Sequence, residues 1–219
     1  MMFAMAGKKF EDKRHSTPPE GLECNLGRMP MLSHNDSSIG QSVAIYFYVA
    51  SECGLMGTNH MEGAQILNIT EHLKEMSTAY YKICPYGETP TAENTTTWFD
   101  EGATDATGAA DRAGYATRYL TWYMGRMEAM LPEGSSTSGF AVGSQASLAD
   151  VCIFYAFAEE LKTEERPEGC AEHKCVPFGD KSKMDSKLKN YPKIEAICKQ
   201  IATNAAIVEW KANRGVQGF

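Results

Sequence analysis

One short segment near the start of the chain has the residue types of an anion-binding site. Gln41 and Ser42 stand where a predicted helix begins, and this helix runs from Gln41 to about Cys53. The backbone N–H groups at the start of a helix have no partner inside it, and the helix dipole is positive there, so an anion is favoured. The alternative interpretation is that Ser42 only caps the helix and that the nearby Pro30 only ends a turn.

A second group of chemically active residues lies late in the chain. Cys170, His173 and Cys175 offer three soft metal ligands, but their spacing differs from that of common zinc sites. A polar surface loop is the preferred interpretation, because residues 163–183 are polar and contain two Pro-x-Gly sequences. We therefore expect no metal. The chain also has no Cys-x-x-Cys motif, which argues against thioredoxin-type dithiol chemistry.

Composition excludes several classes of partner. The 219 residues include 21 Lys and Arg against 28 Asp and Glu, a formal net charge of −7. The basic clusters of the chain, at Lys8-Lys9 and at residues 181–189, are short and adjoin acidic residues. We expect no nucleic acid and no anionic membrane as partner, and no stretch approaches the roughly 18 apolar residues of a membrane helix. The seven cysteines are odd in number and irregularly spaced, which favours a reducing, cytoplasmic location.

The elements that position Pro30 and Gln41-Ser42 are predicted to form a small α/β unit. A strand is predicted at Lys9–Arg14, followed by a turn-rich break. Residues 31–32 and 37–39 flank His34-Asn35-Asp36, which is strong turn chemistry, so a β-hairpin is expected before the helix at Gln41.

The rest of the chain is predicted to be helical. Apolar residues recur at steps of three and four from Ile66 to Ile83, which indicates one face of a long helix. Pro85-Tyr-Gly and the Thr-rich run 89–97 are expected to break it, and further helices are predicted at about 111–131, 148–161, 191–202 and 205–212. This division predicts one domain at residues 1–57 and an all-helical domain at residues 58–219.

Ser147-x-x-Asp150 precedes an apolar run and matches a capping box. We therefore interpret Asp150 as a folding residue and not as a catalytic acid.

Two pairs of segments together resemble the glutathione S-transferase family. The first pair is Gly27-Arg-Met-Pro-Met-Leu and Gly40-Gln-Ser-Val-Ala-Ile, and the second is Gly143-Ser-Gln-Ala-Ser-Leu-Ala-Asp and Tyr191-Pro-Lys-Ile. Their order and separation are most similar to the sigma-like group, which includes prostaglandin D synthases and S-crystallins. The resemblance covers nearly the whole chain and implies a thioredoxin-like domain followed by an all-α domain, usually in a homodimer.

The resemblance implies a glutathione site. Met29-Pro30 would be a cis peptide whose preceding residue meets the cysteinyl part of glutathione, and Gln41-Ser42 would hold the γ-glutamyl carboxylate. Gly27 and Arg28 would also belong to the glutathione-binding residues, while Glu75 would reach across a dimer to the glutathione amino group. The alternative for Glu75 is a plain exposed helix charge. Tyr81 and Trp122 belong to an aromatic set, Tyr80, Tyr81, Tyr119, Trp122, Tyr123 and Met124, that would line a site for a hydrophobic electrophile or form plain core.

Two departures from the family pattern affect activity. The segment from Met2 to Arg14 resembles the end of the family's first helix and its second strand, so the first strand, with its thiolate-stabilising Tyr, Ser or Cys, is expected to be missing. No catalytic residue is therefore assigned. The loop before Gly27 lacks the family's Trp and Lys, for which Lys13, Arg14 or Arg28 would have to substitute.

Two functions follow from these observations. The first is a glutathione transferase that conjugates the glutathione thiolate to hydrophobic electrophiles or catalyses a glutathione-dependent isomerisation. The alternative is a catalytically silent binding or structural protein of the same fold, like the S-crystallins. The intact segments at residues 29–30 and 41–42 favour the enzyme, and the missing strand favours the silent relative.

Overall fold

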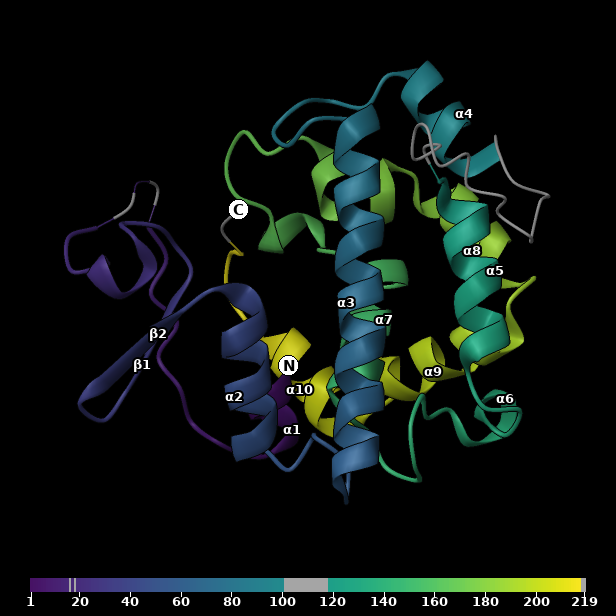
Figure 1. Cartoon of the computed structure of the whole chain (residues 1–219). Helices are drawn as coiled ribbons and strands as arrows, with labels where there is room; N and C mark the ends of the chain where they lie inside the picture. The colour runs from purple at the N-terminus through teal and green to yellow at the C-terminus, as the bar shows by residue number, and fades with distance from the viewer. Residues whose placement is uncertain (16, 18, 101–117, 218–219) are drawn as a thin grey trace, which may run out of the picture.

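The computed structural model describes residues 1–219 apart from 16, 18, 101–117 and 218–219. A small two-stranded sheet lies at one edge, and helices make up the remainder (Figure 1). The strands are β1 (Met31–His34) and β2 (Ser37–Gly40). The helices are α1 (Met2–Met5), α2 (Ser42–Glu52), α3 (His60–Ile83), α4 (Ala92–Asp100), α5 (Leu120–Met130), α6 (Ser135–Ser138), α7 (Leu148–Phe157), α8 (Lys181–Leu188), α9 (Pro192–Ala202) and α10 (Ala205–Asn213).

The predicted hairpin is confirmed. β1 and β2 pair antiparallel with Met31 opposite Gly40, and Asn35 occupies the turn with a φ of 53°. The left-handed region is one that Asn tolerates, which explains why this turn forms here. The predicted strand at Lys9–Arg14 is wrong, since the described residues form only the sheet of β1 and β2. An isolated extended segment has no neighbouring strand for its backbone groups.

Asn25 fixes the loop that leads into β1. Its buried side-chain amide donates to the carbonyl oxygens of Arg28 (2.7 Å) and Pro30 (2.9 Å). A Cβ atom added at Gly40 would lie 2.2 Å from Asn25 Cγ. Glycine at this position therefore lets the end of β2 pass directly over the Asn25 side chain.

The helical part is built around α7, which packs against α3, α9 and α2. Leu148, Ile153, Phe154 and Phe157 of α7 are at most 2% exposed. The apolar face predicted for the long helix is confirmed, because Ile66, Ile69, Leu73 and Met76 of α3 are buried. No helix among the described residues is both long and apolar enough to cross a membrane.

Three predictions about the helical part need correction or limitation. The Thr-rich run does not remain a break, since α4 begins at Ala92, capped by reciprocal hydrogen bonds of Thr91 and Asn94. Burial of Trp98 and Phe99 outweighs the low helix propensity of threonine. For the helix predicted at 111–131, α5 accounts for its second half, and residues 111–117 lie outside the described part.

Residues 163–183 are more ordered than a polar surface loop. They contain 3₁₀ turns at Thr163–Glu165, Glu172–Cys175 and Pro177–Gly179, and α8 begins at Lys181. A charge cluster that sequence composition does not reveal anchors this segment at Glu165, which is 2% exposed. Arg214 Nε lies 2.6 Å from Glu165 Oε1, and Arg214 Nη1 lies 2.7 Å from Glu159 Oε1. The guanidinium of Arg214 holds the pKa of Glu165 below its ordinary value.

The capping box at the start of α7 is confirmed. Asp150 is fully buried, and its carboxylate accepts hydrogen bonds from Ser147 N (2.7 Å), Ser147 Oγ (2.6 Å) and Ala141 N (2.6 Å). The carboxylate thereby ties the segment before α7 to the helix itself, which agrees with a folding role.

We predict that Asp150→Ala lowers the free energy of unfolding by about 3 kcal/mol, because two backbone N–H groups and a buried hydroxyl lose their acceptor. Urea denaturation followed by circular dichroism measures the change. Ser144→Ala, at an exposed position of the same segment, is the control and should change stability by less than about 0.5 kcal/mol. Equal stability of the two variants would contradict the structural role of Asp150.

Glu165→Gln should lower the free energy of unfolding by about 3 kcal/mol at neutral pH, because Arg214 then loses a buried charged partner. The pKa of Glu165 is depressed in the folded state, so its contribution is present above the unfolded value of about 4.3 and is lost as pH falls through the folded pKa. Urea denaturation of both proteins across this range should show their difference shrinking. Glu164→Gln, at an exposed neighbour, is the matched control. A difference that stays constant down to low pH would contradict the ion-pair explanation.

Candidate functional site

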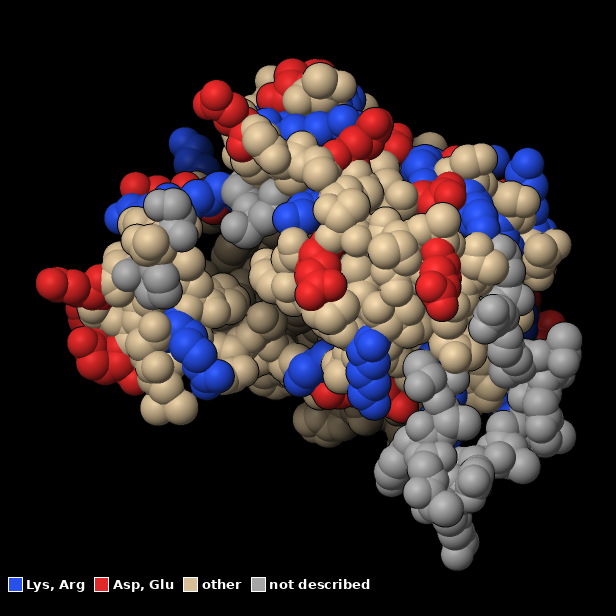
Figure 2. All heavy atoms as spheres, turned by 90° about the horizontal axis from the view of Figure 1, so that it is seen from above, with Lys and Arg blue, Asp and Glu red and all other residues tan. Residues whose placement is uncertain are grey.

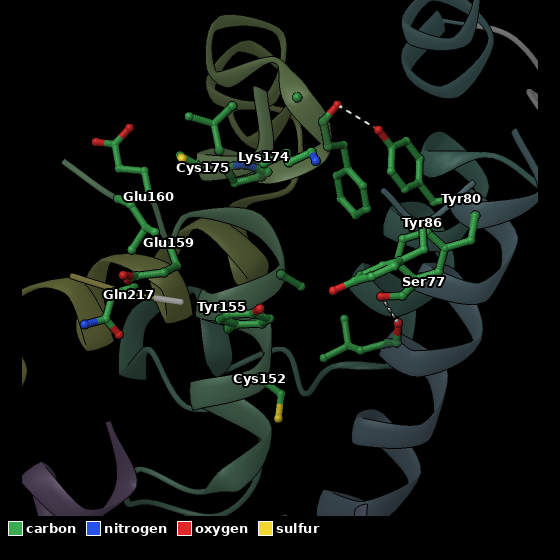
Figure 3. A pocket seen from close by; sticks show the side chains of 18 of the residues that line it. Ser77, Tyr80, Tyr86, Cys152, Tyr155, Glu159, Glu160, Lys174, Cys175 and Gln217 are labelled. Atoms are coloured by element: carbon green, nitrogen blue, oxygen red, sulfur yellow. Dashed lines mark hydrogen bonds between the residues drawn. The ribbon is translucent and has the colours of Figure 1, made fainter. Parts of the chain in front are cut away.

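A cleft of about 1030 Å³ lies between α2, α3 and α7, and the segments around residues 84–90 and 173–179 form its outer wall. Figure 3 shows side chains of α3, of α7 and of the outer wall pointing into the same space, with Tyr155 of α7 between Cys152 and the outer wall. On the surface seen in Figure 2, acidic and basic side chains are mixed without a large patch of either sign.

The first turn of α2 faces this cleft. Ser42 and Val43 line it, and no side chain caps the helix. Gln41 precedes the helix with a φ of 67°, in the left-handed region that a residue with a side chain adopts only at a cost of about 1–3 kcal/mol. The uncapped N–H groups and the helix dipole provide the chemistry of an anion site.

The hairpin brings Met29-Pro30 next to the start of α2. Met31 pairs with Gly40. The residues just beyond this pair, Pro30 before β1 and Gln41 after β2, therefore lie next to each other. The Met29-Pro30 peptide is cis, as the resemblance implied. Within the described part of the chain, the backbone N–H and C=O of Met29 make no hydrogen bond. The structure therefore places an open peptide edge beside the start of α2.

Gly27 and Arg28 hold the loop before this peptide. Gly27 has a φ of 73°, which glycine adopts without strain, and Arg28 N donates to Asn25 O at 3.1 Å. The side chain of Arg28 is exposed near the predicted site. Of the other two cations considered, Lys13 pairs with Glu11, while Arg14 pairs with Asp12 and lines the cleft.

Tyrosine side chains make up much of the cleft wall. Tyr81 is 45% exposed and contacts Tyr86 edge to face, while Tyr155 and Tyr46 line the side nearer α2. Burial is the main cause that raises the pKa of Tyr46, Tyr81 and Tyr155 above the ordinary value, so all three hydroxyls carry their protons at neutral pH. The cleft can therefore accept an aromatic or apolar molecule and donate hydrogen bonds to it.

Two predicted site residues lie elsewhere. Trp122 of α5 does not line the cleft, and it packs between the guanidinium groups of Arg118 (4.1 Å) and Arg126 (5.8 Å). Glu75 of α3 pairs with Arg118 at 3.5 Å and with His72 at 3.7 Å. The structure thus brings Ser42 and Tyr81 together and leaves Trp122 and Glu75 beside Arg118.

Sequence reasoning missed several residues of the cleft, namely Tyr46, Tyr86, Cys152, Tyr155 and Lys174. Tyr46 and Tyr155 lie in helices that read as apolar, and Tyr86 lies in a segment interpreted as a break. A tyrosine inside such segments was the available signal, because its hydroxyl needs water or a partner. The described residues contain no group of three side chains arranged to hold a metal ion.

Comparison with known proteins identifies the helical part. A family model described as "Glutathione S-transferase, C-terminal domain" matches residues 93–214, more than half of the chain. S-crystallin 2 from Enteroctopus dofleini is 24% identical over 225 residues, covering 100% of this chain and 91% of the relative. Glutathione S-transferase 1 from Ascaris suum is 36% identical over 78 residues, covering 34% of this chain and 38% of the relative.

Solved structures show the same fold. The glutathione S-transferase from Ascaris lumbricoides has a TM-score of 0.64 at 21% identity, and the match covers 100% of this chain and 91% of that one. The rat hPGDS structure complexed with a quinoline has a TM-score of 0.61 at 16% identity, with 100% and 90% covered. The predicted fold class, a thioredoxin-like unit followed by a helical domain, is confirmed, and the described part of the first unit contains a two-stranded sheet. The chain belongs to the glutathione S-transferase family, and its S-crystallin relatives agree with the sigma-like group that its sequence indicated.

Proposed function

We propose that this chain binds glutathione at the junction of the hairpin and α2. The carboxylate of the γ-glutamyl group would accept hydrogen bonds from the first turn of α2 at Ser42, beside Gln41. The open peptide edge of Met29 would pair with the cysteinyl backbone. The observation that carries the proposal is the register of β1 and β2, which brings Pro30 next to Gln41.

The tyrosine-lined cleft would hold the second substrate. Ser42 and Tyr81 line the same cleft, so a glutathione carboxylate on α2 and an apolar electrophile beside Tyr81 would share one space. Attack of the glutathione thiolate on that electrophile, or a glutathione-dependent isomerisation, is the activity we propose for the protein. We assign no described residue to stabilise the thiolate.

A second candidate is a catalytically silent binding or structural protein. The similarity to S-crystallin 2 over the whole chain favours it, because S-crystallins are structural relatives of the transferases. Both candidates keep the proposed glutathione contacts and differ in turnover.

We further propose a cytoplasmic homodimer, with domains at residues 1–57 and 58–219. In such a dimer Glu75 would contact the glutathione amino group of the other subunit. One solved neighbour, Na-GST-3 from the hookworm Necator americanus, is described as monomeric, so the fold does not by itself require a dimer.

Calorimetric titration with glutathione tests the site. We expect Gln41→Ala/Ser42→Ala to weaken binding at least about tenfold, equivalent to about 1.4 kcal/mol, because the carboxylate site is disturbed. The control, Ser51→Ala, alters an exposed serine at the other end of α2 and should bind like the unmodified chain.

Circular dichroism must show all three proteins folded. Equal affinity of the double variant and the control would contradict the proposed site. Spectrophotometric assay with a chlorinated nitroaromatic electrophile separates the two candidate functions, since only the transferase forms the conjugate.

A further inference from the structure

Two cysteines lie in direct contact near the outer wall of the cleft, and Cys175 lines that wall. The Sγ atoms of Cys170 and Cys175 are 3.8 Å apart. Cys175 is 4% exposed, whereas Cys170 is only partly buried. Both belong to the segment that was interpreted as a metal-free polar loop, and neither has a role in the proposed glutathione site.

The sulfur atoms of this pair must come closer before a disulfide can form. A disulfide requires an S–S distance of about 2.05 Å, so the two atoms must approach by about 1.8 Å. The intervening residues form one 3₁₀ turn at Glu172–Cys175, closed by a bond from Lys174 N to Ala171 O at 3.0 Å. Rotation about the Cα–Cβ bond of the more exposed Cys170 supplies such a movement without unfolding the turn.

The two thiols differ in reactivity. Burial and the neighbouring sulfur of Cys170 raise the pKa of Cys175 to about 11, so this thiol holds its proton at neutral pH. A thiol attacks as its thiolate, and a partly exposed thiol is reached first by a reagent from solution. Cys170 is therefore the first sulfur to react, and Cys175 lies within reach of the product.

We propose that Cys170 and Cys175 form a reversible disulfide by exchange with a low-molecular-mass disulfide such as glutathione disulfide. The Cys170 thiolate attacks one sulfur of the reagent, which forms a mixed disulfide and releases one glutathione thiolate. Cys175 loses its proton to solvent and attacks Cys170 Sγ, which releases the second glutathione. Two protein thiols are oxidised and one disulfide is reduced to two thiols.

Disulfide formation would change the wall of the cleft. Lys174 and Cys175 line its wall, and Cys175 O accepts a hydrogen bond of 2.9 Å from Leu161 N. Figure 3 shows Cys175 and Lys174 on the ribbon above Tyr155 and opposite Tyr80. This inference is independent of the proposed glutathione site, since glutathione disulfide serves only as a thiol oxidant.

Peptide mapping tests the pair directly. The folded full-length chain is equilibrated with glutathione disulfide, blocked with N-ethylmaleimide and digested with trypsin, which cuts after Lys174 and so separates the two cysteines. We expect peptides 163–174 and 175–181 to appear linked by a disulfide, and dithiothreitol to release them. Cys24→Ser, which removes the exposed cysteine of another region, should leave this link unchanged.

Single variants identify the order of attack. Cys175→Ser should accumulate a glutathionyl adduct on Cys170 at a level several-fold above the unmodified chain, because nothing resolves it. Cys170→Ser should form little adduct on the buried Cys175. Absence of the linked peptides in the unmodified chain, or separate adducts on both cysteines there, would overturn the proposal.

Discussion

The pairing of Met31 with Gly40 is the constraint on which the proposed site depends. It places Pro30 beside Gln41, so that an open peptide edge lies next to the uncapped start of α2. Asn25 stabilises this arrangement, because its side-chain amide donates hydrogen bonds to the carbonyl oxygens of Arg28 and Pro30. A shift of one residue would move each side chain of the hairpin to its other face.

The rest of the cleft depends on the helical core. α7 supplies Tyr155 and Cys152, and the carboxylate of Asp150 fixes where that helix begins. Beyond its end, Glu159 and Glu165 bind Arg214, which anchors the outer segment that carries Cys175. The buried carboxylate of Asp150 thus holds the start of α7, and the ion pairs of Arg214 hold the segment beyond its end. The tyrosines of the cleft remain available to a ligand.

Local patterns in the sequence predict much of this structure. The hairpin, the long apolar face of α3 and the capping box before α7 depend on residues close together in the chain, and all three are present. The strand at Lys9–Arg14 failed because a strand needs a partner that local sequence does not supply. The helix at Ala92–Asp100 was missed because the burial of Trp98 and Phe99 arises from the tertiary fold.

The candidate site divides in the same way. Residues 27–30 and 41–42 were predicted because short motifs carry them, and the hairpin brings these motifs together. The tyrosines and the Arg214 cluster come from segments far apart in sequence, and no local pattern links Glu165 to Arg214. The distance between Cys170 and Cys175 likewise depends on how one turn folds. From the sequence spacing alone, this segment could be either a metal site or a loop.

Backbone amide shifts measured by NMR during titration with glutathione test the central claim most directly. We expect the amides of Met29, Ser42 and Val43 to shift together with one dissociation constant, while amides at the far end of α2, such as Ser51, stay in place. Saturable shifts confined to other elements, with Met29 and Ser42 unchanged, would contradict it.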